Sequence, residues 1–502
     1  MNDLTVIAAS GKALPDAVRV NRHWIGGVWR ESAASFERVS PSHGVVVSRS
    51  ALGGAAEVDA AVAAARAAFA GWSRASGKTR AAVLLKVADL IEARAEPMAR
   101  IETLETGKPI AQARGEVTGA ADLWRYAASL ARTLHGDSHN SLGSDMLGVV
   151  LKEPIGVVSV ICPWNFPFWI LSQKLPFALA AGCACVVKPS EMTPSTAVML
   201  ADILEEAGLP AGVVNIVLGY GQPVGALMAS HDGVDMVTFT GSTAVGKSIA
   251  AAASATLKKV ALELGGKNPQ VIFPDADMDS AADAVTFGTY FNAGECCNSG
   301  SRIIVHEDIA ADFTARVVAL SRRVAFGDPL NEATQVGAIV STAHQGKIDG
   351  YVKAAVAAGA RVVLGGGPMV VAGLPGEFYQ PTVVTGVMPD MAIAREEVFG
   401  PVLAVLTFRT LDEAVALAND ASYGLSAGVW SENVHTCLEF ARRVQAGTIW
   451  TNTWMDGFPE MTFGGMKQSG SGREIGRFGL DEFMEIKTVA MRVGRTRANW
   501  VR

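Results

Sequence analysis

Hydrophobic residues along the chain follow two different rhythms, one helical and one typical of strands that alternate with helices. Between residues 55 and 134, apolar side chains recur at intervals of three and four positions, most clearly in 60–69 and 80–91. This spacing puts the apolar residues on one face of a helix. We therefore predict amphipathic helices across this region, each with one buried face.

From about residue 155, short apolar runs alternate with helical patterns. The runs expected to form strands are 156–161, 184–187, 213–217, 235–240 and 259–262. One helix between them is predicted from Pro194 to Ala207, with Thr193 as its N-terminal cap and Pro194 in its first turn. Apolar strands that alternate with helices indicate a parallel sheet covered on both faces.

A second alternation of strands and helices extends from about residue 270 to 465. Its predicted strands are 302–305, 361–364 and 401–406, and one of its helices is predicted over 309–324. Gly265 and Gly266 follow the last strand of the first alternation, and adjacent glycines commonly separate elements. The pattern therefore predicts an α/β fold with two domains that join near these glycines.

The composition is that of a large protein with extensive cores. The chain has 502 residues, of which 49% are hydrophobic, and this is enough for two or three domains. A net charge of −6, with no polybasic cluster, argues against a nucleic-acid partner. The uncharged segment 154–173 is long enough for a membrane span, but Pro163 and Pro167 predict a strand, a loop and a helix start instead. No membrane partner is expected.

The cysteines and the N-terminal residues bear on the cellular compartment. Six cysteines occur without any C-x-x-C pair, so neither a zinc site nor a thioredoxin motif is expected. The first residues lack the basic segment and apolar core of a secretion signal. Thiols without such a signal are typical of a reducing compartment, so we predict a cytoplasmic protein with no bound metal.

Two adjacent cysteines and an upstream glutamate are the residues most suggestive of chemistry. Cys296 and Cys297 lie in the unusual segment 290–302, and Glu263 opens the run 263–267. A thiolate is a strong nucleophile, and a nearby carboxylate can take the proton of a thiol. The pair predicts an enzyme that attacks an electrophilic carbon covalently.

Residues 241–248 support a competing interpretation, because they satisfy the P-loop pattern G-x-x-x-x-G-K-S/T. The segment follows a predicted strand and opens a predicted helix, whose N-terminus favours phosphate. A P-loop nucleoside triphosphatase also needs a carboxylate at a strand end for magnesium, and the only nearby candidate is Asp275, next to Pro274. This alternative leaves the cysteine segment unexplained.

Seven motifs in order resemble those of the NAD(P)-dependent aldehyde dehydrogenase superfamily, with features of its betaine-aldehyde and aminoaldehyde branch. They are 163–167, 188–191, 239–242, 263–267, 294–297, 396–401 and 463–470. The resemblance implies a Rossmann-like NAD-binding domain, an α/β catalytic domain and a small β oligomerisation arm, in a homodimer or homotetramer. The implied ranges are 1–130 with 152–263 for NAD binding, 264–465 for catalysis, and 131–151 with 466–502 for the arm and C-terminal segment.

The resemblance implies oxidation of an aldehyde to a carboxylic acid through a cysteine thiohemiacetal and a thioester. Cys297 is the implied nucleophile, and Glu263 is the implied base, which takes the thiol proton and later activates water. Asn165 and the Cys297 backbone N–H are the implied donors to the oxyanion, and Glu474 is an implied proton relay. Simpler roles stay open here, namely a lysine ion pair for Glu263 and a plain turn for Asn165.

The same resemblance implies NAD as the cofactor, with NADP less favoured because the carboxylate of Glu191 would face a 2′-phosphate. Lys188 and Glu191 match positions that hold the adenosine ribose, and an exposed ion pair is the simpler alternative. His344 departs from the pattern, because the family often has glutamine three residues before the matching Lys347. The implied cofactor-binding residues are Ile161, Pro163, Trp164, Lys188, Ser190, Glu191, Gly241, Ser242, Leu264, Lys347, Glu397 and Phe399.

The residues that match substrate-tunnel positions are Phe166, Phe291 and Trp454, and Asp456 adds a carboxylate nearby. Aromatic rings with carboxylates suit a quaternary ammonium group, which they attract by cation–π interaction. Gln173 stands where the betaine-aldehyde branch commonly has tryptophan, so the predicted cage lacks one wall. We expect a small aldehyde substrate, either betaine aldehyde or an amino aldehyde, and the alternative is a neutral aromatic or aliphatic aldehyde.

Overall fold

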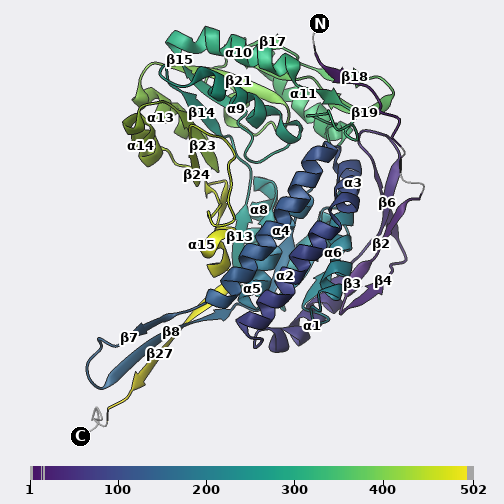
Figure 1. Cartoon of the computed structure of the whole chain (residues 1–502), viewed down its shortest axis with the longest axis vertical. Helices are drawn as coiled ribbons and strands as arrows, with labels where there is room; N and C mark the ends of the chain where they lie inside the picture. Colours follow the sequence, from purple (N-terminus) through teal and green to yellow (C-terminus); the bar gives the residue numbers. More distant parts are fainter. Residues whose placement is uncertain (1–3, 13, 15–16, 495–502) are drawn as a thin grey trace.

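The computed structural model describes residues 4–12, 14 and 17–494, which form two α/β parts and a protruding β arm (Figure 1). Four helices precede the first long alternation of strands and helices: α1 (Ala55–Trp72), α2 (Gly77–Ala93), α3 (Ala95–Thr106) and α4 (Ile110–Thr133). The helical runs predicted at 60–69 and 80–91 lie inside α1 and α2, and both helices bury an apolar face. The prediction of amphipathic helices in this region is confirmed.

The first α/β part is built on an eight-stranded sheet with the order β26-β13-β12-β9-β10-β11-β3-β4. Its strands are β9 (Val157–Ile161), β10 (Ala184–Lys188), β11 (Val214–Ile216), β12 (Met236–Thr240), β13 (Lys259–Glu263), β3 (His23–Ile25), β4 (Val28–Arg30) and β26 (Gly470–Ser471). The five strands from β13 to β11 are parallel, as the apolar runs predicted. The other three are antiparallel additions at the two edges.

Helices cover both faces of this sheet. One face packs against α1, α7 (Ala226–Ser230) and α8 (Thr243–Ala253). The other packs against α5 (Pro167–Ala181) and α6 (Ser195–Glu206), with α2 and α4 outside them. The central strands are therefore buried on two sides, which explains why every residue of β9, β10 and β12 is apolar or buried polar.

The predicted start of α6 differs by one residue from the structure. Pro194, not Thr193, is the N-terminal cap, and no side chain accepts a hydrogen bond there. The backbone N–H of Thr193 donates to the carbonyl of Ser190 at 3.1 Å, so Thr193 belongs to the preceding turn. Pro194 already has helical backbone angles, φ −78° and ψ −22°, and the proline ring favours that φ.

The second α/β part contains a seven-stranded sheet with the order β17-β20-β21-β15-β14-β23-β24. Its strands are β14 (Pro269–Ile272), β15 (Arg302–His306), β17 (Arg361–Leu364), β20 (Thr382–Thr385), β21 (Val402–Phe408), β23 (Ser426–Trp430) and β24 (Thr448–Thr451). The helices around it are α9 (Met278–Tyr290), α10 (Ala310–Arg323), α11 (Thr342–Ala357), α12 (Ala392–Arg395), α13 (Leu411–Asn419) and α14 (Val434–Arg443). The predicted strands and the helix at 309–324 are confirmed.

Short strands and a C-terminal helix complete the fold. They are β1 (Val6–Ile7) with β16 (Phe326–Gly327), β2 (Arg19–Asn21) with β6 (Val46–Ala51) and β5 (Ser35–Val39), β18 (Pro368–Val371) with β19 (Leu374–Tyr379), β22 (Tyr423–Gly424) with β25 (Met466–Lys467), and α15 (Gly476–Asp481). The pairing of β1 with β16 and of β26 with β13 carries each end of the chain onto the other α/β part. The two parts are thereby joined by more than the segment between β13 and β14.

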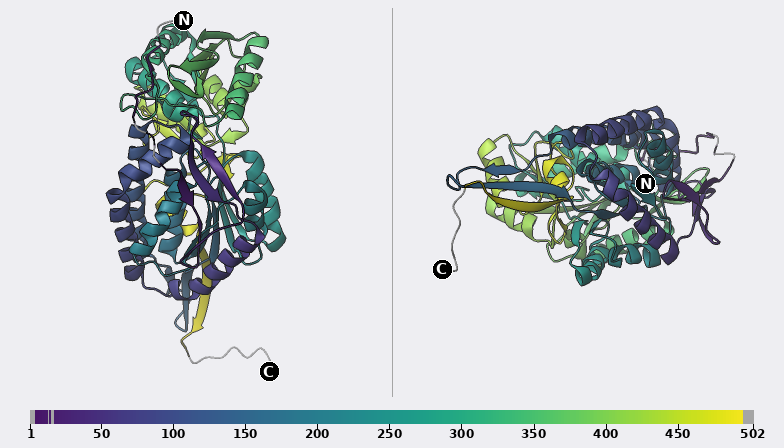
Figure 2. Two further views of the ribbon diagram at one scale, coloured as in Figure 1. Left: turned by 90° about the vertical axis from the view of Figure 1, so that its right-hand side faces the viewer. Right: turned by 90° about the horizontal axis from the view of Figure 1, so that it is seen from below.

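A three-stranded arm projects from the body, as Figures 1 and 2 show. It consists of β7 (Asp137–His139), β8 (Met146–Pro154) and β27 (Met484–Arg492) in the order β27-β8-β7. Strand β27 comes from near the C-terminus and pairs along the whole of β8. The remainder of the predicted C-terminal segment, 495–502, lies outside the described residues.

The uncharged segment 154–173 contains the end of β8, all of β9, a loop and the first half of α5, as predicted. No helix among the residues that the structure describes has the length and apolarity needed to cross a membrane.

Candidate active site

Four parallel strands of the first sheet end at one edge, each on or next to a residue that the sequence singled out. Strand β9 ends at Ile161, β10 at Lys188, β12 at Thr240 and β13 at Glu263. The register pairs Lys188 with Ile161 and Thr240 with Glu263. In open α/β sheets, ligands bind beyond the carboxyl ends of the strands. The fold therefore gathers separate sequence motifs at the edge where a ligand is expected.

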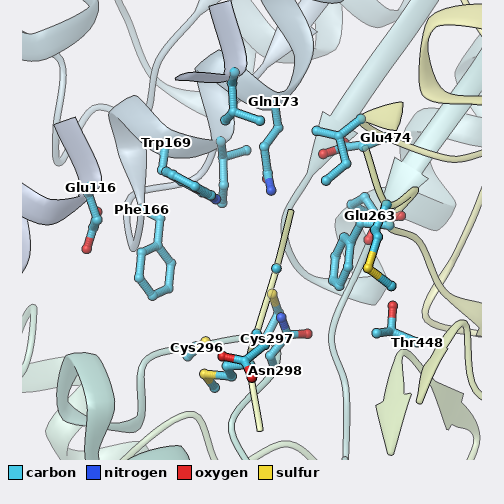
Figure 3. Close-up of a pocket in the computed structure, with 18 of the residues that line it drawn as sticks. Glu116, Phe166, Trp169, Gln173, Glu263, Cys296, Cys297, Asn298, Thr448 and Glu474 are labelled. Atoms are coloured by element: carbon cyan, nitrogen blue, oxygen red, sulfur yellow. The ribbon is translucent and has the colours of Figure 1, made fainter. Parts of the chain in front are cut away.

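A cavity of about 440 Å³ opens beside this edge, within the size range of small-molecule sites. Glu263 and Cys297 both line it, which brings the two predicted catalytic groups to one space. In Figure 3, Glu263 and Glu474 lie at the right of the cavity, Phe166 lies at the left, and Cys297 lies below and between them. The cavity can hold a small substrate between the thiol and the carboxylate.

The cysteine segment follows α9 in a tight turn with unusual backbone angles. Asn292, Ala293 and Gly294 have φ values of 50°, 57° and 71°, in a region that side chains with a Cβ rarely adopt. Asn268 then fixes the segment, because its Nδ2 donates to the carbonyl of Cys297 at 2.7 Å. Cys297 is left half-buried in the cavity wall.

Glu263 is buried, and its Oε1 has no hydrogen-bond partner among the described residues. Burial raises the pKa of this carboxyl well above its usual value, and the neighbouring Glu474 carboxylate raises it further. A raised pKa makes the carboxylate a better base near neutral pH. The simpler ion-pair interpretation is wrong, because Lys258 donates to a backbone carbonyl and Lys259 pairs with Glu482.

The thiol of Cys297 has a pKa well above its usual value. The largest cause is a hydrogen bond to the thiol of Cys296, followed by burial and by the negative charges of Glu263 and Glu397. The thiol in this state is protonated near neutral pH, and only the thiolate is a strong nucleophile. The arrangement therefore requires a base to accept the proton, and Glu263 is a buried carboxylate that lines the same cavity.

Asn165 does more than form a turn, because its side chain is hydrogen-bonded to the cysteine segment. Its Nδ2 donates to the carbonyl of Glu295 at 3.1 Å, and Asn292 donates to the carbonyl of Asn165 at the same distance. A side-chain amide has two N–H groups, so a second donor is left for a ligand. The backbone N–H of Cys297 makes no hydrogen bond to any residue in the described ranges. Two donors are thus available beside the thiol.

Glu474 lies behind Glu263 and also lines the cavity. It forms a buried ion pair with Lys174, and Thr240 donates from its hydroxyl to Glu474 Oε1 at 3.5 Å. A buried ionisable group is usually paired in this way. The charge of Glu474 raises the pKa of Glu263, and a proton-relay role for Glu474 stays a prediction.

The predicted ribose-binding pair is present and is only partly exposed. Lys188 is buried at the end of β10, where burial lowers the pKa of its ammonium group and Glu191 partly offsets that effect. Its Nζ lies 3.4 Å from Glu191 Oε2 and 3.0 Å from the carbonyl of Pro189. Ser190 Oγ accepts the N–H of Met192 at 3.2 Å in the same turn. The pair is therefore not the fully exposed ion pair of the simpler alternative.

Residues 241–248 do not form a P-loop. Helix α8 begins at Thr243, directly after its cap Ser242, so no phosphate-wrapping loop separates it from β12. The N–H of Gly246 is already bonded to the carbonyl of Ser242 at 2.9 Å, and Lys247 donates to an exposed glutamine side chain. The glycine N–H and the lysine that a P-loop turns toward the phosphates are engaged elsewhere, so the triphosphatase interpretation is wrong.

The loop after α12 brings Glu397 and Phe399 next to the glycines that follow β13. The Oε1 of Glu397 accepts the N–H of Gly266 at 3.1 Å, and burial raises the pKa of this carboxyl to about 7. A Cβ at Gly265 would lie 2.4 Å from Glu397 Oε2, so only glycine allows this approach. The ring of Trp164 meets that of Phe399 edge to face, with centroids 5.5 Å apart.

Two of the three predicted tunnel residues line the cavity. The rings of Phe166 and Phe291 are stacked with centroids 5.9 Å apart. Lys108 Nζ lies 4.6 Å from the centroid of the Phe166 ring, so a protein cation already uses one face of that ring. Trp454 does not line the cavity: it is buried, and its ring fills the space beside Gly288, Gly300 and Gly428.

Several cavity residues were missed from the sequence, among them Trp169, Trp450 and Glu116. Trp169 precedes Gln173 by one helical turn, so helical spacing on α5 could have placed both on one face. Trp450 lies in β24, and its place in the cavity wall depends on the pairing of strands distant in sequence. Glu116 is buried on α4 and paired with Lys108 at 2.5 Å.

Comparisons with known proteins agree with this geometry. The model of the Aldehyde dehydrogenase family matches residues 29–489, so the chain belongs to that family. The enzyme is therefore an NAD(P)-dependent aldehyde oxidoreductase. A crystal structure of an NAD-dependent aldehyde dehydrogenase from Sinorhizobium meliloti has a TM-score of 0.96 and 50% sequence identity, and the match covers 99% of each chain.

Two relatives have names that differ in how closely they specify the aldehyde. The betaine aldehyde dehydrogenase of Bacillus subtilis (strain 168) is 39% identical over 95% of this chain and 98% of its own length. The mitochondrial aldehyde dehydrogenase of Homo sapiens is 41% identical over 97% of this chain and 96% of its own length. The similarity is nearly equal, so overall identity does not select the aldehyde.

Proposed function

We propose that this protein oxidises an aldehyde with a cationic head group, such as betaine aldehyde or an amino aldehyde, to the carboxylic acid with NAD. Cys297 is the nucleophile and Glu263 the base. The observation that carries the proposal is the buried Glu263 carboxylate, whose unpartnered oxygen shares a cavity with the Cys297 thiol. A protein that merely binds ligands has no need of an uncompensated buried acceptor beside a thiol.

In the proposed reaction, Glu263 accepts the thiol proton and Cys297 Sγ attacks the aldehyde carbon to form a thiohemiacetal. The Asn165 side chain and the Cys297 backbone N–H donate to the new oxyanion. NAD, held by the residues at the strand edge, would supply the acceptor for the hydride of that carbon, and Cys297 would then carry a thioester. Glu263 releases the thiol proton to solvent and then accepts a proton from water, so that hydroxide adds to the thioester carbon. The bond between that carbon and Cys297 Sγ breaks, which releases the carboxylic acid and restores the thiolate.

The residues at the strand edge fit NAD. Lys188 and Glu191 can bind the adenosine ribose hydroxyls, and the carboxylate disfavours a 2′-phosphate, so we propose NAD over NADP. The N-terminus of α8 can accept a pyrophosphate, while Ile161, Pro163 and Leu264 form the adjoining edge. Gly265 leaves room for Glu397 to approach the backbone, where its carboxylate can bind the nicotinamide ribose.

The aromatic lining supports a cationic substrate. Trp169 and Trp450 offer rings to the cavity, and Asp456 is close enough to Trp450 for its carbonyl to accept the indole N–H at 2.8 Å. The two rings take the place of the tryptophan that the betaine-aldehyde branch commonly has where this chain has Gln173. Because Lys108 already lies over one face of Phe166, we assign the cation–π contacts to the two tryptophans.

A pair of isosteric aldehydes tests the substrate proposal. Betaine aldehyde and 3,3-dimethylbutanal have the same shape, and only the first is charged. We expect kcat/KM, calculated on the free aldehyde, to be about tenfold or more higher for betaine aldehyde, since each ring contributes ~0.5–2 kcal/mol to cation binding. The ratio is expected to fall in Trp450→Leu. Equal kcat/KM values for the two aldehydes in the wild-type enzyme would show that the tunnel takes neutral aldehydes.

We further propose that the β arm joins subunits in a homodimer or homotetramer. Leu151 on β8 and Ile486 and Met491 on β27 are exposed, although they belong to a sheet. Exposed apolar strands are commonly covered by another chain. Light scattering is expected to give the mass of a dimer or tetramer, and Ile486→Lys is expected to weaken the assembly. A wild-type monomer at micromolar concentration would be incompatible with this role.

We also propose that the protein is located in the cytoplasm. All six cysteines are free thiols in the structure, including the adjacent pair at Cys296 and Cys297. Thiols that stay reduced are typical of a reducing compartment. Fractionation of the producing cell with antibodies against the chain would test the location.

A further inference from the structure

Two side chains of helix α11 form hydrogen bonds to the loop that carries Glu397 and Phe399. Lys347 Nζ donates to the carbonyl of Glu397 at 3.4 Å, and His344 Nε2 bonds to the carbonyl of Phe399 at 2.7 Å. Residues three apart lie on the same face of a helix. The two side chains therefore hold alternate carbonyls of one loop, and the histidine makes the shorter bond.

The bond to Phe399 defines the state of His344. A carbonyl can only accept, so His344 Nε2 carries the hydrogen. Burial lowers the pKa of His344 to about 4, and Lys347 lowers it too, although the bond to Phe399 acts in the opposite direction. The imidazole is therefore neutral near pH 7, with Nε2–H as the donor. The other titratable group with an atom close to Nε2 is Glu295, whose Oε1 lies 3.8 Å away and whose pKa burial raises well above its usual value.

His344 also belongs to a cluster of three rings. Its ring is edge-on to those of Trp164 and Phe399, with centroids 5.7 and 5.8 Å away, and those two rings are 5.5 Å apart. Phe399 has a φ of 59°, an uncommon conformation for an aromatic residue, so the surroundings must hold it in place. A hydrogen bond to its own carbonyl is a direct way to do so.

Glu295, which lies near the same nitrogen of His344, belongs to the cysteine segment. The carboxylate of Glu295 accepts the N–H of Val340 at 2.9 Å, just before α11 begins. The carbonyl of Glu295 accepts the side-chain N–H of Asn165. His344 thus stands between the residues proposed for the nicotinamide and those proposed for the oxyanion.

We infer that His344 is a positioning residue that holds Phe399 and Trp164 in the arrangement that binds the nicotinamide end of NAD. The inference rests on the proposed function, since it takes the loop at 397–399 as part of the cofactor site. It also assigns a role to the position where the chain departs from the glutamine often found in the family. A glutamine amide can donate to a carbonyl in the same way, whereas an apolar side chain cannot.

The test is the affinity for NAD, measured by titration calorimetry on the full-length protein without aldehyde. His344→Leu and His344→Phe are expected to raise the Kd by about tenfold, at the upper end of the effect of one lost hydrogen bond. His344→Phe keeps a ring in the cluster, so an equal loss in both variants assigns the effect to the donor. His344→Gln is expected to bind within about threefold of wild type.

His306 provides a matched control. Its Nε2 bonds to the carbonyl of Arg409 at 3.0 Å, and its ring is edge-on to Phe408, but neither partner belongs to the loop that carries Glu397 and Phe399. His306→Leu is expected to leave the Kd for NAD unchanged. With turnover, His344→Leu is expected to raise KM for NAD and leave KM for aldehyde within about twofold.

Four results separate the possible failures. Wild-type affinity in both His344→Leu and His344→Phe would overturn the inference, as would an equal loss of affinity in His306→Leu. Failure of His344→Gln to restore binding would also overturn it, because the donor would then not be the relevant group. A wild-type protein that does not bind NAD would instead contradict the proposed function, on which the inference rests.

Discussion

Cys297→Ala is expected to lower aldehyde-dependent NADH formation by at least about 10⁴-fold, because alanine cannot form the thiohemiacetal or the thioester. The residue is half-buried, and its replacement removes one sulfur atom from the wall of an open cavity, so the fold should be retained. The measurement is the initial rate of absorbance at 340 nm with saturating NAD and aldehyde. The Kd for NAD is expected to stay within about threefold, which separates loss of chemistry from loss of binding.

Cys437→Ala is the control for this substitution. Cys437 is buried in α14, where its thiol donates to the carbonyl of Ser431 at 3.4 Å, and it does not line the cavity. Its replacement is expected to change stability slightly and the rate of NADH formation by less than about twofold. An undiminished rate in Cys297→Ala would exclude the covalent mechanism, and an equal loss in both variants would point to the fold.

Glu263→Gln is expected to separate the two halves of the reaction. Glutamine has the shape of glutamate but cannot accept a proton at this position, so hydrolysis of the thioester should slow by about 10²–10⁴-fold. Because the thiol has a raised pKa, its deprotonation should also slow. At high pH, where the thiolate forms without help, we expect a burst of up to one NADH per subunit followed by a slow steady rate. Mass spectrometry should then find the acyl group on Cys297.

The pH dependence of the wild-type enzyme provides the matching control. Burial raises the pKa of Glu263, so the base is available only above that raised value, and kcat should rise with pH through it. In Glu474→Gln, a charge that raises the pKa of Glu263 is removed, and the rise in kcat should move to lower pH. A pH profile of Glu263→Gln that matched the wild type would contradict the assignment of Glu263 as the base.

Much of the local structure was predictable because it depends on contacts near in sequence. Apolar runs of four to six residues became the buried parallel strands, and the three-to-four spacing at 60–69 and 80–91 became helices. Cys297 and Glu263 could be singled out for the same reason, since each sits in a short recognisable motif. The N-terminal cap of α6 shows the limit of such predictions. Thr193 was expected to be the cap, but its N–H bonds to the carbonyl of Ser190 in the preceding turn, and Pro194 is the cap instead.

The sequence by itself determined the kinds of elements, their order and the chemical groups that are available. Only the tertiary structure decided which of those groups meet. Trp454 was expected in the tunnel, but close packing against three glycines buries it, and Trp450 takes its place. Residues 241–248 have a P-loop pattern, but the helix begins too early to wrap a phosphate chain. His344 reaches Phe399 through α11 and a loop 55 residues further along the chain. Burial, charge interaction and orientation arise from segments far apart in sequence, and local spacing carries no information about them.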